Sequence, residues 1–307
     1  MHERVPYDEF AFFHENAAEF ALPFESAPRV RRVEVAVAPG RQLSALVWGD
    51  GVPELVLLHG GGQNAHTWDT VALALARPLV AIDLPGHGHS DAARDQDRLS
   101  PEDNAADVAI VIRAIAGDAA AVVGMSLGGL TTIALADLAP ELVRRAVLVD
   151  VTPGVNAVKS KAISDFVRGP RTFANFDELL QRTIEHNPER SVASLRRGIL
   201  HNAMQLADGS WMWRYRRFDG KGVVGDSDQP TGPDFGRLWE PLGRTTMPLL
   251  LARGMRKQSV VDDADVAELV RRRPDAQVVE FAEAGHSLQG DTPLELATTI
   301  ADFVAGR

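Results

Sequence analysis

The sequence predicts an α/β fold in which a mostly parallel, eight-stranded sheet carries helices on both faces. Short apolar runs recur along the chain, mostly separated by helical stretches, and strands buried on both faces have this composition. A Gly-x-Ser-x-Gly motif also joins one of these runs directly to a helix-forming run. The expected strands are Val33–Ala38, Leu43–Trp48, Glu54–Leu58, Leu79–Asp83, Ala121–Gly124, Ala146–Val149, Pro248–Arg253 and Gln277–Phe281.

The segments around these strands divide the chain into an extension, a core and an insertion. Residues 1–30 form an N-terminal extension with an amphipathic helix expected at Asp8–Phe20. Residues 31–151 and 245–307 form the core, and its first two strands are expected to be antiparallel because little chain separates them. Residues 152–244 lie between strands six and seven. A structureless loop of that length is uncommon in a compact domain, so a helical cap is expected there.

Composition narrows the class of protein and its partners. The 307 residues include no cysteine, so neither a disulfide nor a thiolate metal site is expected. The formal net charge of -10 argues against a nucleic-acid partner, because phosphate contacts need a concentrated basic face. No apolar run reaches the ~20 residues of a membrane span, and we read no export signal, so a cytoplasmic protein without a membrane partner is expected. A homodimer remains one alternative for the assembly.

Ser126 is the predicted nucleophile because it lies at the centre of the Gly-x-Ser-x-Gly motif. Gly124 and Gly128 flank it, and a side chain at either position would crowd a sharp turn between strand and helix. Such a turn presents the hydroxyl at a helix start, where free backbone N–H groups favour a developing negative charge. The motif therefore indicates nucleophilic catalysis.

His286 is the candidate base that would take the proton from the serine hydroxyl. It lies in a loop directly after the last expected strand, and Gly285 would allow the imidazole to approach the serine closely. His87 and His89 are interpreted as parts of a loop, because two close histidines without a third ligand rarely define a metal site. No metal site is predicted.

Asp150 is the first candidate for the carboxylate that orients this histidine. It follows the sixth expected strand, at the carboxyl edge of the sheet, where catalytic groups gather in open α/β folds. Ser126, Asp150 and His286 also follow one another in the order nucleophile, acid and histidine, as the motif's usual context requires.

Three aspartates after the seventh expected strand, Asp262, Asp263 and Asp265, are the alternative acid. Acidic residues are also expected where they open a helix, here the one that runs to Arg271, because the helix dipole favours them. The residues alone leave the assignment of the acid open.

An oxyanion requires N–H donors that are in place before the reaction. One donor should be Leu127, directly after the nucleophile, and the other should be Gly61 in the glycine-rich stretch after the third strand. Gly62 of the same stretch can bring its backbone close to the substrate, since it has no side chain. Trp211 and Trp213 either line an apolar substrate pocket or form the interior of the cap.

The chain resembles the α/β-hydrolase superfamily from about residue 31 to residue 307. The resemblance rests on the stretches His59–Trp68, Asp83–Ser90, Gly124–Gly129 and Gly285–His286. It implies the mostly parallel sheet, no cofactor, and a helical cap between strands six and seven over the pocket. Members usually carry the acid shortly after strand seven, where this chain has Met255–Ser259. Some relatives carry it after strand six, which Asp150 matches.

The expected activity is hydrolysis of small, largely apolar carboxylic esters or lactones through an acyl-enzyme. The alternatives are a carbon–carbon bond hydrolase acting on ring-cleavage dienoates and a non-catalytic ligand receptor on the same fold. A haloalkane dehalogenase or an epoxide hydrolase would need a carboxylate nucleophile, and residue 126 is a serine.

Overall fold

A central sheet of eight strands organises the chain, in the order β1-β2-β4-β3-β5-β6-β10-β11. The structure is a computed structural model that describes residues 4–92, 100–216 and 235–307. The strands are β1 (Val30–Ala38), β2 (Arg41–Trp48), β3 (Leu55–Leu58), β4 (Leu79–Ile82), β5 (Ala121–Met125), β6 (Ala146–Val149), β10 (Leu249–Gly254) and β11 (Gln277–Phe281). The eight predicted strands are confirmed, with ends that differ by no more than a few residues.

Strand direction also follows the prediction. β2 pairs antiparallel with both β1 and β4, and the remaining neighbours run parallel. Within the parallel part, Met125 of β5 lies opposite Val149 of β6. The residues that follow these two strands are therefore neighbours at the carboxyl edge of the sheet.

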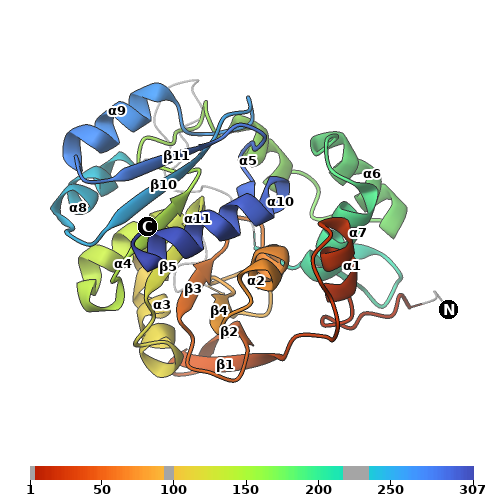
Figure 1. Cartoon of the computed structure of the whole chain (residues 1–307). Coiled ribbons are helices and arrows are strands. Elements are labelled where there is room, and N and C mark those ends of the chain that lie inside the picture. The colour runs from red at the N-terminus through yellow and green to blue at the C-terminus, as the bar shows by residue number, and fades with distance from the viewer. Residues whose placement is uncertain (1–3, 93–99, 217–234) are drawn as a thin grey trace.

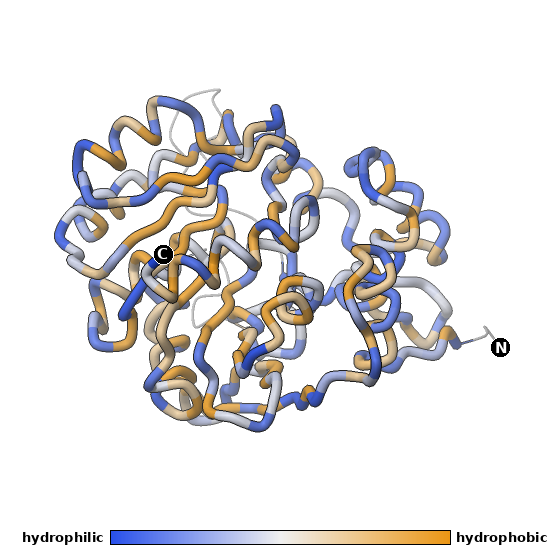
Figure 2. Tube along the Cα trace, viewed as in Figure 1, coloured by the Kyte–Doolittle hydropathy of each residue, from blue (hydrophilic) through white to orange (hydrophobic). Residues whose placement is uncertain are grey.

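Helices cover both faces of the sheet and give three layers (Figure 1). One face packs against α2 (Asp69–Leu75), α10 (Leu288–Asp291) and α11 (Pro293–Ala305). The other packs against α3 (Pro101–Ile115), α4 (Leu127–Leu138), α8 (Trp239–Arg244) and α9 (Asp263–Arg272). The central strands are almost uniformly apolar, because both of their faces are covered (Figure 2).

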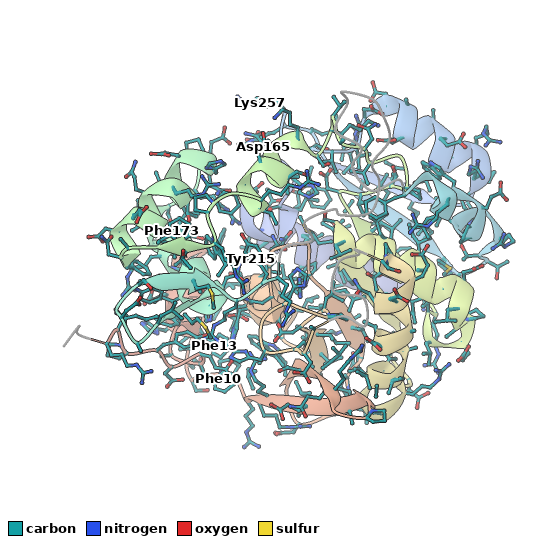
Figure 3. The ribbon with its side chains drawn as sticks, turned by 180° about the vertical axis from the view of Figure 1, so that it is seen from behind. Phe10, Phe13, Asp165, Phe173, Tyr215 and Lys257 are labelled. Carbon is teal, nitrogen blue, oxygen red and sulfur yellow. The ribbon has the colours of Figure 1, made fainter. Side chains whose placement is uncertain are left out.

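The N-terminal helix, α1, is shorter than predicted and spans Phe13–Glu19. The chain before it forms turns, and Phe10 from that part stacks on Phe13 with ring centroids 6.1 Å apart (Figure 3). Phe13 in turn packs against Trp48 of β2 at 4.9 Å. The extension is thus anchored on the sheet by aromatic contacts.

The inserted segment contains a small sheet as well as helices. Helices α5 (Lys161–Val167), α6 (Phe176–His186) and α7 (Val192–Asn202) are joined by a three-stranded antiparallel sheet in the order β7-β9-β8. Its strands are β7 (Thr172–Phe173), β8 (Ala203–Gln205) and β9 (Trp211–Trp213). The prediction of a helical cap did not include this sheet, whose strands are only two or three residues long.

The end of the inserted segment belongs to the main core. Leu238, Trp239 and Leu242 pack in the large apolar cluster with α4, although the sequence prediction assigned them to the cap. Residues 217–234 of the predicted cap lie outside the described residues. Within the described ranges, no helix is both long and apolar enough to cross a membrane.

Candidate active site

Ser126 occupies a sharp turn between β5 and α4, with the strained backbone angles φ 51° and ψ −114°. A Cβ added at Gly124 would lie 2.3 Å from the carbonyl oxygen of Gly128. A Cβ added at Gly128 would lie 2.3 Å from the carbonyl oxygen of Leu58 in β3. Both approaches are too close for any side chain, so the two glycines allow strand, turn and helix to pack this tightly.

Asp150 and His286 are joined by a hydrogen bond of 2.9 Å between Oδ2 and Nδ1. Asp150 follows β6, His286 follows β11, and the aspartate is fully buried. Asp150 also accepts hydrogen bonds from the N–H of Gly254 at 3.0 Å, the hydroxyl of Ser259 at 2.6 Å and the N–H of Val260 at 3.0 Å. These donors stabilise a buried carboxylate and fix its orientation.

The alternative aspartates lie at the start of α9, and none of the hydrogen bonds or ion pairs described for this structure joins them to His286. Asp262 caps the helix and forms a capping box with Asp265. Both also pair with Lys159 of the inserted segment, at 2.8 and 2.7 Å. Asp263 pairs with Arg253 at 2.7 Å. These three aspartates thus have the positions expected of acidic residues that open a helix. Asp150 is the aspartate that pairs with His286.

Ser126 lies one strand away from the Asp150–His286 pair. Its N–H donates to the carbonyl of Val149, the residue before Asp150, at 3.2 Å. Among the hydrogen bonds of the described residues, none joins the Ser126 hydroxyl to His286. Catalytic hydrogen bonds of this kind are often long in the absence of substrate and tighten in the Michaelis complex. The three groups therefore lie at one edge of the sheet, and the hydrogen bond between the serine and the histidine is not formed in this structure.

The glycine-rich loop after β3 leaves one N–H available. The N–H of Gly60 donates to Gln63 Oε1 at 3.0 Å, and the N–H of Gly62 donates to His87 Nε2 at 3.0 Å. Within the described part of the chain, the N–H of Gly61 has no hydrogen-bond partner, and a Cβ added there would meet nothing within 4 Å. Leu127 begins α4, where the first N–H groups lack intrahelical partners. Gly61 and Leu127 thus have the free donors that an oxyanion requires.

His87 is a functional candidate that sequence reasoning missed. Its Nε2 accepts from Gly62, so its Nδ1 must carry the proton and donate to the carbonyl of Pro85, at 3.0 Å. Burial lowers the pKa of His87, which keeps the imidazole neutral and able to accept. No local pattern could reveal this role, because it depends on the contact between two loops 25 residues apart.

His59 holds the other end of the same loop. Its Nε2 accepts from the N–H of Leu84 at 2.9 Å, and its Nδ1 donates to the carbonyl of Gly60 at 2.8 Å. Burial lowers the pKa of His59 to about 3, with a further contribution from His87. Two neutral histidines therefore hold the loop in the conformation that leaves Gly61 free.

The cap contacts this loop at Gly62. A Cβ on Gly62 would lie 3.0 Å from Val167 and 3.7 Å from the ring of Tyr215. The side chain of Asn202, the last residue of α7, also donates to the Gly62 carbonyl. Residues of the inserted segment thus cover the predicted oxyanion loop.

Trp211 and Trp213 lie in the apolar interior of the cap, and each is 4% exposed. Trp211 meets Phe176 edge-on at 5.0 Å, and Trp213 stacks on Tyr215 at 5.6 Å. The structure thus gives both residues the packing role that the sequence offered as one alternative. Tyr215, on which Trp213 stacks, lies in turn against Gly62 of the loop.

The chain belongs to the alpha/beta hydrolase family, whose model matches residues 55–299. It is 43% identical over 301 residues to esterase Rv0045c of Mycobacterium tuberculosis, an alignment that covers 96% of this chain and 95% of the relative. A crystal structure of that esterase aligns with a TM-score of 0.84 and 41% identity, over 99% of this chain and 100% of that one. A second structure, described together with the inhibition of that esterase by transition metals, gives a TM-score of 0.83 at the same identity and coverage.

A more distant neighbour supports the fold alone. The crystal structure of E-2-(acetamidomethylene)succinate hydrolase aligns with a TM-score of 0.76 and 24% identity, over 90% of this chain and 100% of that one. The predicted fold class and the predicted family are therefore both confirmed.

Proposed function

We propose that this hydrolase cleaves small, largely apolar carboxylic esters or lactones through an acyl-enzyme on Ser126. The observation that carries the proposal is the buried Asp150–His286 pair at the sheet edge beside the strained Ser126 turn. The similarity to an esterase over nearly the whole chain supports an ester substrate. Ser126 is a nucleophile, His286 a base and Asp150 an orienting group in this proposal.

In the first half of the reaction, the hydroxyl oxygen of Ser126 attacks the ester carbonyl while His286 Nε2 takes the hydroxyl proton. Asp150 holds the Nδ1 proton of the resulting imidazolium. The carbonyl oxygen becomes an oxyanion, which accepts hydrogen bonds from the N–H groups of Gly61 and Leu127. When the carbon–oxygen bond to the alcohol breaks, His286 returns the proton to that leaving oxygen.

In the second half, a water molecule attacks the acyl-enzyme. His286 takes one proton from this water, and the new hydroxyl forms the carboxylic acid as the bond to Ser126 breaks. The proton then returns to the serine oxygen, so the enzyme is restored. A lactone follows the same path, except that its alcohol and acid remain one molecule.

The apolar preference of the substrate is proposed from the residues next to the loop. Val167 and Tyr215 lie against Gly62, and both belong to the inserted segment. An acyl chain bound beside Gly62 would meet these side chains, while its carbonyl oxygen points toward Gly61. Trp213 supports Tyr215 from behind and acts on the substrate through that ring.

The decisive experiment compares the wild-type enzyme with Ser126→Ala on short p-nitrophenyl esters and on a chromogenic dienoate. We expect the ester activity to fall by as much as ~10⁶-fold in kcat, because no other group can form the acyl-enzyme. A fluorophosphonate probe should label Ser126 in the wild type and leave the variant unlabelled. Circular dichroism would check that the variant folds.

Three results would overturn the proposal. Ester hydrolysis that persists in folded Ser126→Ala would exclude the serine mechanism. A wild-type chain that neither hydrolyses esters nor reacts with the probe would favour a ligand receptor on the same fold. Faster turnover of the dienoate than of every ester would replace ester cleavage by carbon–carbon bond hydrolysis.

A further inference from the structure

Three buried side chains outside the candidate active site form a group with metal-binding composition. They are His66, Asp69 and His201, and one ligand atom of each lies within 4.8 Å of the others. His66 is in the short 3-10 helix η1 (Ala65–Trp68), Asp69 begins α2, and His201 is in α7. The group therefore joins the core to the cap, and we call it the seam cluster.

Two polar atoms of the seam cluster have no hydrogen-bond partner among the described residues. They are Oδ1 of Asp69 and Nε2 of His201, on residues that are 1% and 5% exposed. A buried polar atom without a partner costs about 1–3 kcal/mol, so such atoms require an explanation. An ion bound by the Asp69 carboxylate and by Nε2 of His201 would give both groups the partner that they lack.

The remaining nitrogen of each histidine is held by an outer partner. Nε2 of His66 lies 3.1 Å from the carboxylate of Glu9, and Nδ1 of His201 lies 2.9 Å from the hydroxyl of Tyr7. Histidines that bind metals usually have this arrangement, in which the second ring N–H donates to a carboxylate or another oxygen and fixes the ring. It directs Nδ1 of His66 and Nε2 of His201 toward Asp69.

The spacing of these atoms suits a small divalent ion. Asp69 Oδ2 lies 2.9 Å from Nδ1 of His66 and 3.9 Å from Nε2 of His201. Metal–ligand bonds of ~2.0–2.1 Å in a tetrahedral site place neighbouring ligand atoms about 3.3 Å apart, between these two values. The two imidazole rings stack at 3.9 Å, so one ring must tilt to direct both nitrogens at a single ion.

Arg32, Arg197 and Arg214 are the cations that act on the cluster, and the first two are paired with carboxylates. Arg32 pairs with Glu9 and Asp83 and lies on the Nε2 side of His66, at 3.5 Å, away from Nδ1. A bound ion would replace the proton shared between His66 and Asp69, and this proton would be released to solvent. The charge at the cluster then rises by only one unit.

We propose that the seam cluster binds one divalent transition-metal ion of the zinc type, with His66, Asp69 and His201 as ligands and a water as the fourth. Two imidazoles and one carboxylate are a common ligand set for zinc. Tyr7 and Glu9 of the N-terminal extension cover the site, so the ion enters when this segment lifts away.

The ion would also act on the candidate active site. His201 is followed by Asn202, which donates to the carbonyl of Gly62 in the predicted oxyanion loop. Asn64, next to this loop, donates to the carbonyl of His201 at 3.0 Å. An ion that fixes His201 therefore fixes the end of α7, which holds the loop. The seam cluster is thus a site through which metal binding can change esterase turnover.

The test uses full-length protein freed of metal by a chelator. Isothermal titration with ZnCl₂ should show one ion per chain, and CoCl₂ should give the intense visible absorption of a tetrahedral nitrogen–oxygen site. His201→Phe keeps a stacked ring without a ligand, and Asp69→Asn keeps the shape without the charge. Each should weaken zinc binding by at least ~100-fold, since outer-shell changes alone cost 10–100-fold. Tyr7→Phe, which keeps all three ligands, should weaken it by ~10-fold.

Two controls separate the seam cluster from other histidines. His286→Gln removes the candidate catalytic histidine, and His186→Gln removes an exposed one. Both should bind zinc as the wild type does, with the same cobalt spectrum. Circular dichroism reports whether each variant folds, and the Tyr7→Phe and wild-type cobalt measurements remain decisive if His201→Phe does not.

Three results would overturn the proposal. The first is a wild type that titrates without any heat of zinc binding, or that gives only the weak spectrum of hydrated cobalt. The second is zinc binding that survives unchanged in folded His201→Phe and Asp69→Asn. Binding that disappears in His286→Gln and persists in His201→Phe would assign the ion to the Asp150–His286 pair instead.

Discussion

Two buried aspartate–histidine pairs among the described residues are joined by the same two atoms at the same distance. Asp150 and His286 meet through Oδ2 and Nδ1 at 2.9 Å, and Asp69 and His66 meet through the same atoms at the same distance. The first pair lies at the carboxyl edge of the sheet, and the second lies between the core and the cap. The distance within the pair therefore cannot distinguish their roles.

The surroundings of the two carboxylates differ. Asp150 accepts from two backbone N–H groups and a serine hydroxyl besides the histidine, so both of its oxygens are satisfied. Asp69 has one oxygen without a partner among the described residues. A satisfied carboxylate can only orient its histidine, whereas an unsatisfied one can still take a cation.

The histidines differ in the same way. Nε2 of His66 is held by Glu9, so that ring has no nitrogen free for proton transfer. Burial by itself would lower the pKa of His66, but the Asp69 and Glu9 carboxylates raise it to about 9. His66 is therefore an imidazolium at neutral pH. A catalytic base needs a free Nε2, and of the two histidines in these pairs His286 is the one with no described hydrogen bond at that atom.

The largest expected effect separates the two aspartates. Asp150→Asn should lower kcat on a p-nitrophenyl ester by on the order of 10⁴-fold, because an amide stabilises neither the correct tautomer nor the imidazolium. Asp69→Asn should leave kcat of the folded enzyme within a few-fold of the wild type. It should lower the free energy of unfolding by about 3–5 kcal/mol, since it leaves a buried charge without its partner.

Steady-state kinetics and urea denaturation of both variants check this contrast. A similar loss of kcat in both variants would show that the two pairs do not differ in role. A loss in Asp263→Asn that matches the loss in Asp150→Asn would return the orienting role to the aspartates at the start of α9.

The next effect concerns the loop that leaves Gly61 free. His87→Ala removes the acceptor of the Gly62 N–H and should lower kcat by up to ~10²-fold, the effect of a misplacement of about 1 Å at a reacting centre. KM should change little, because the substrate still binds beneath the cap. His87→Gln should recover part of the activity, since its amide oxygen can accept the same N–H.

His89→Gln is the matched control in the same loop, where the histidine side chain is 31% exposed. It should retain the kcat of the wild type. Equal losses in His87→Ala and His87→Gln, together with a raised KM, would assign His87 a packing role rather than a positioning one.

The features that the sequence could predict are those that depend on local patterns. A strand such as Ala146–Val149 is a short apolar run, and this composition does not depend on which strands lie beside it. All eight strands could therefore be predicted from the sequence. Ser126 and its glycines form a local motif, and His286 follows a predicted strand. The acid remained open between Asp150 and the later aspartates, because the choice depends on a contact 136 residues apart.

The remaining features depend on packing between distant segments. His66 and Asp69 are three residues apart, but His201 reaches them only through the fold of the cap, so no spacing predicted the seam cluster. The same holds for His87, whose partner Gly62 lies on another loop. The small cap sheet was missed because strands of two or three residues have no detectable alternation.

The smallest expected effect tests how Asp150, the proposed acid, is held in place after strand six. Ser259 lies in the stretch where family members usually carry the acid, and here its hydroxyl donates to Asp150 at 2.6 Å. A hydrogen bond to a charged group contributes about 1.5–3 kcal/mol, and part of it is kept when water or a neighbour replaces it. Ser259→Ala should therefore lower kcat by roughly 10-fold.

Two further variants show whether this loss comes from the orientation of Asp150. Ser259→Thr keeps the hydroxyl and should restore most of kcat. Asp262→Ala, three residues along, removes the cap of α9 and should cost ~1 kcal/mol of stability without changing kcat. If Ser259→Ala behaves like Asp262→Ala, the loop after β10 only supports the fold. A loss of kcat without a loss of stability in Ser259→Ala would assign the loop a different role. The loop has no carboxylate where family members usually carry the acid, and it would instead supply hydrogen-bond donors that hold Asp150, the residue after β6.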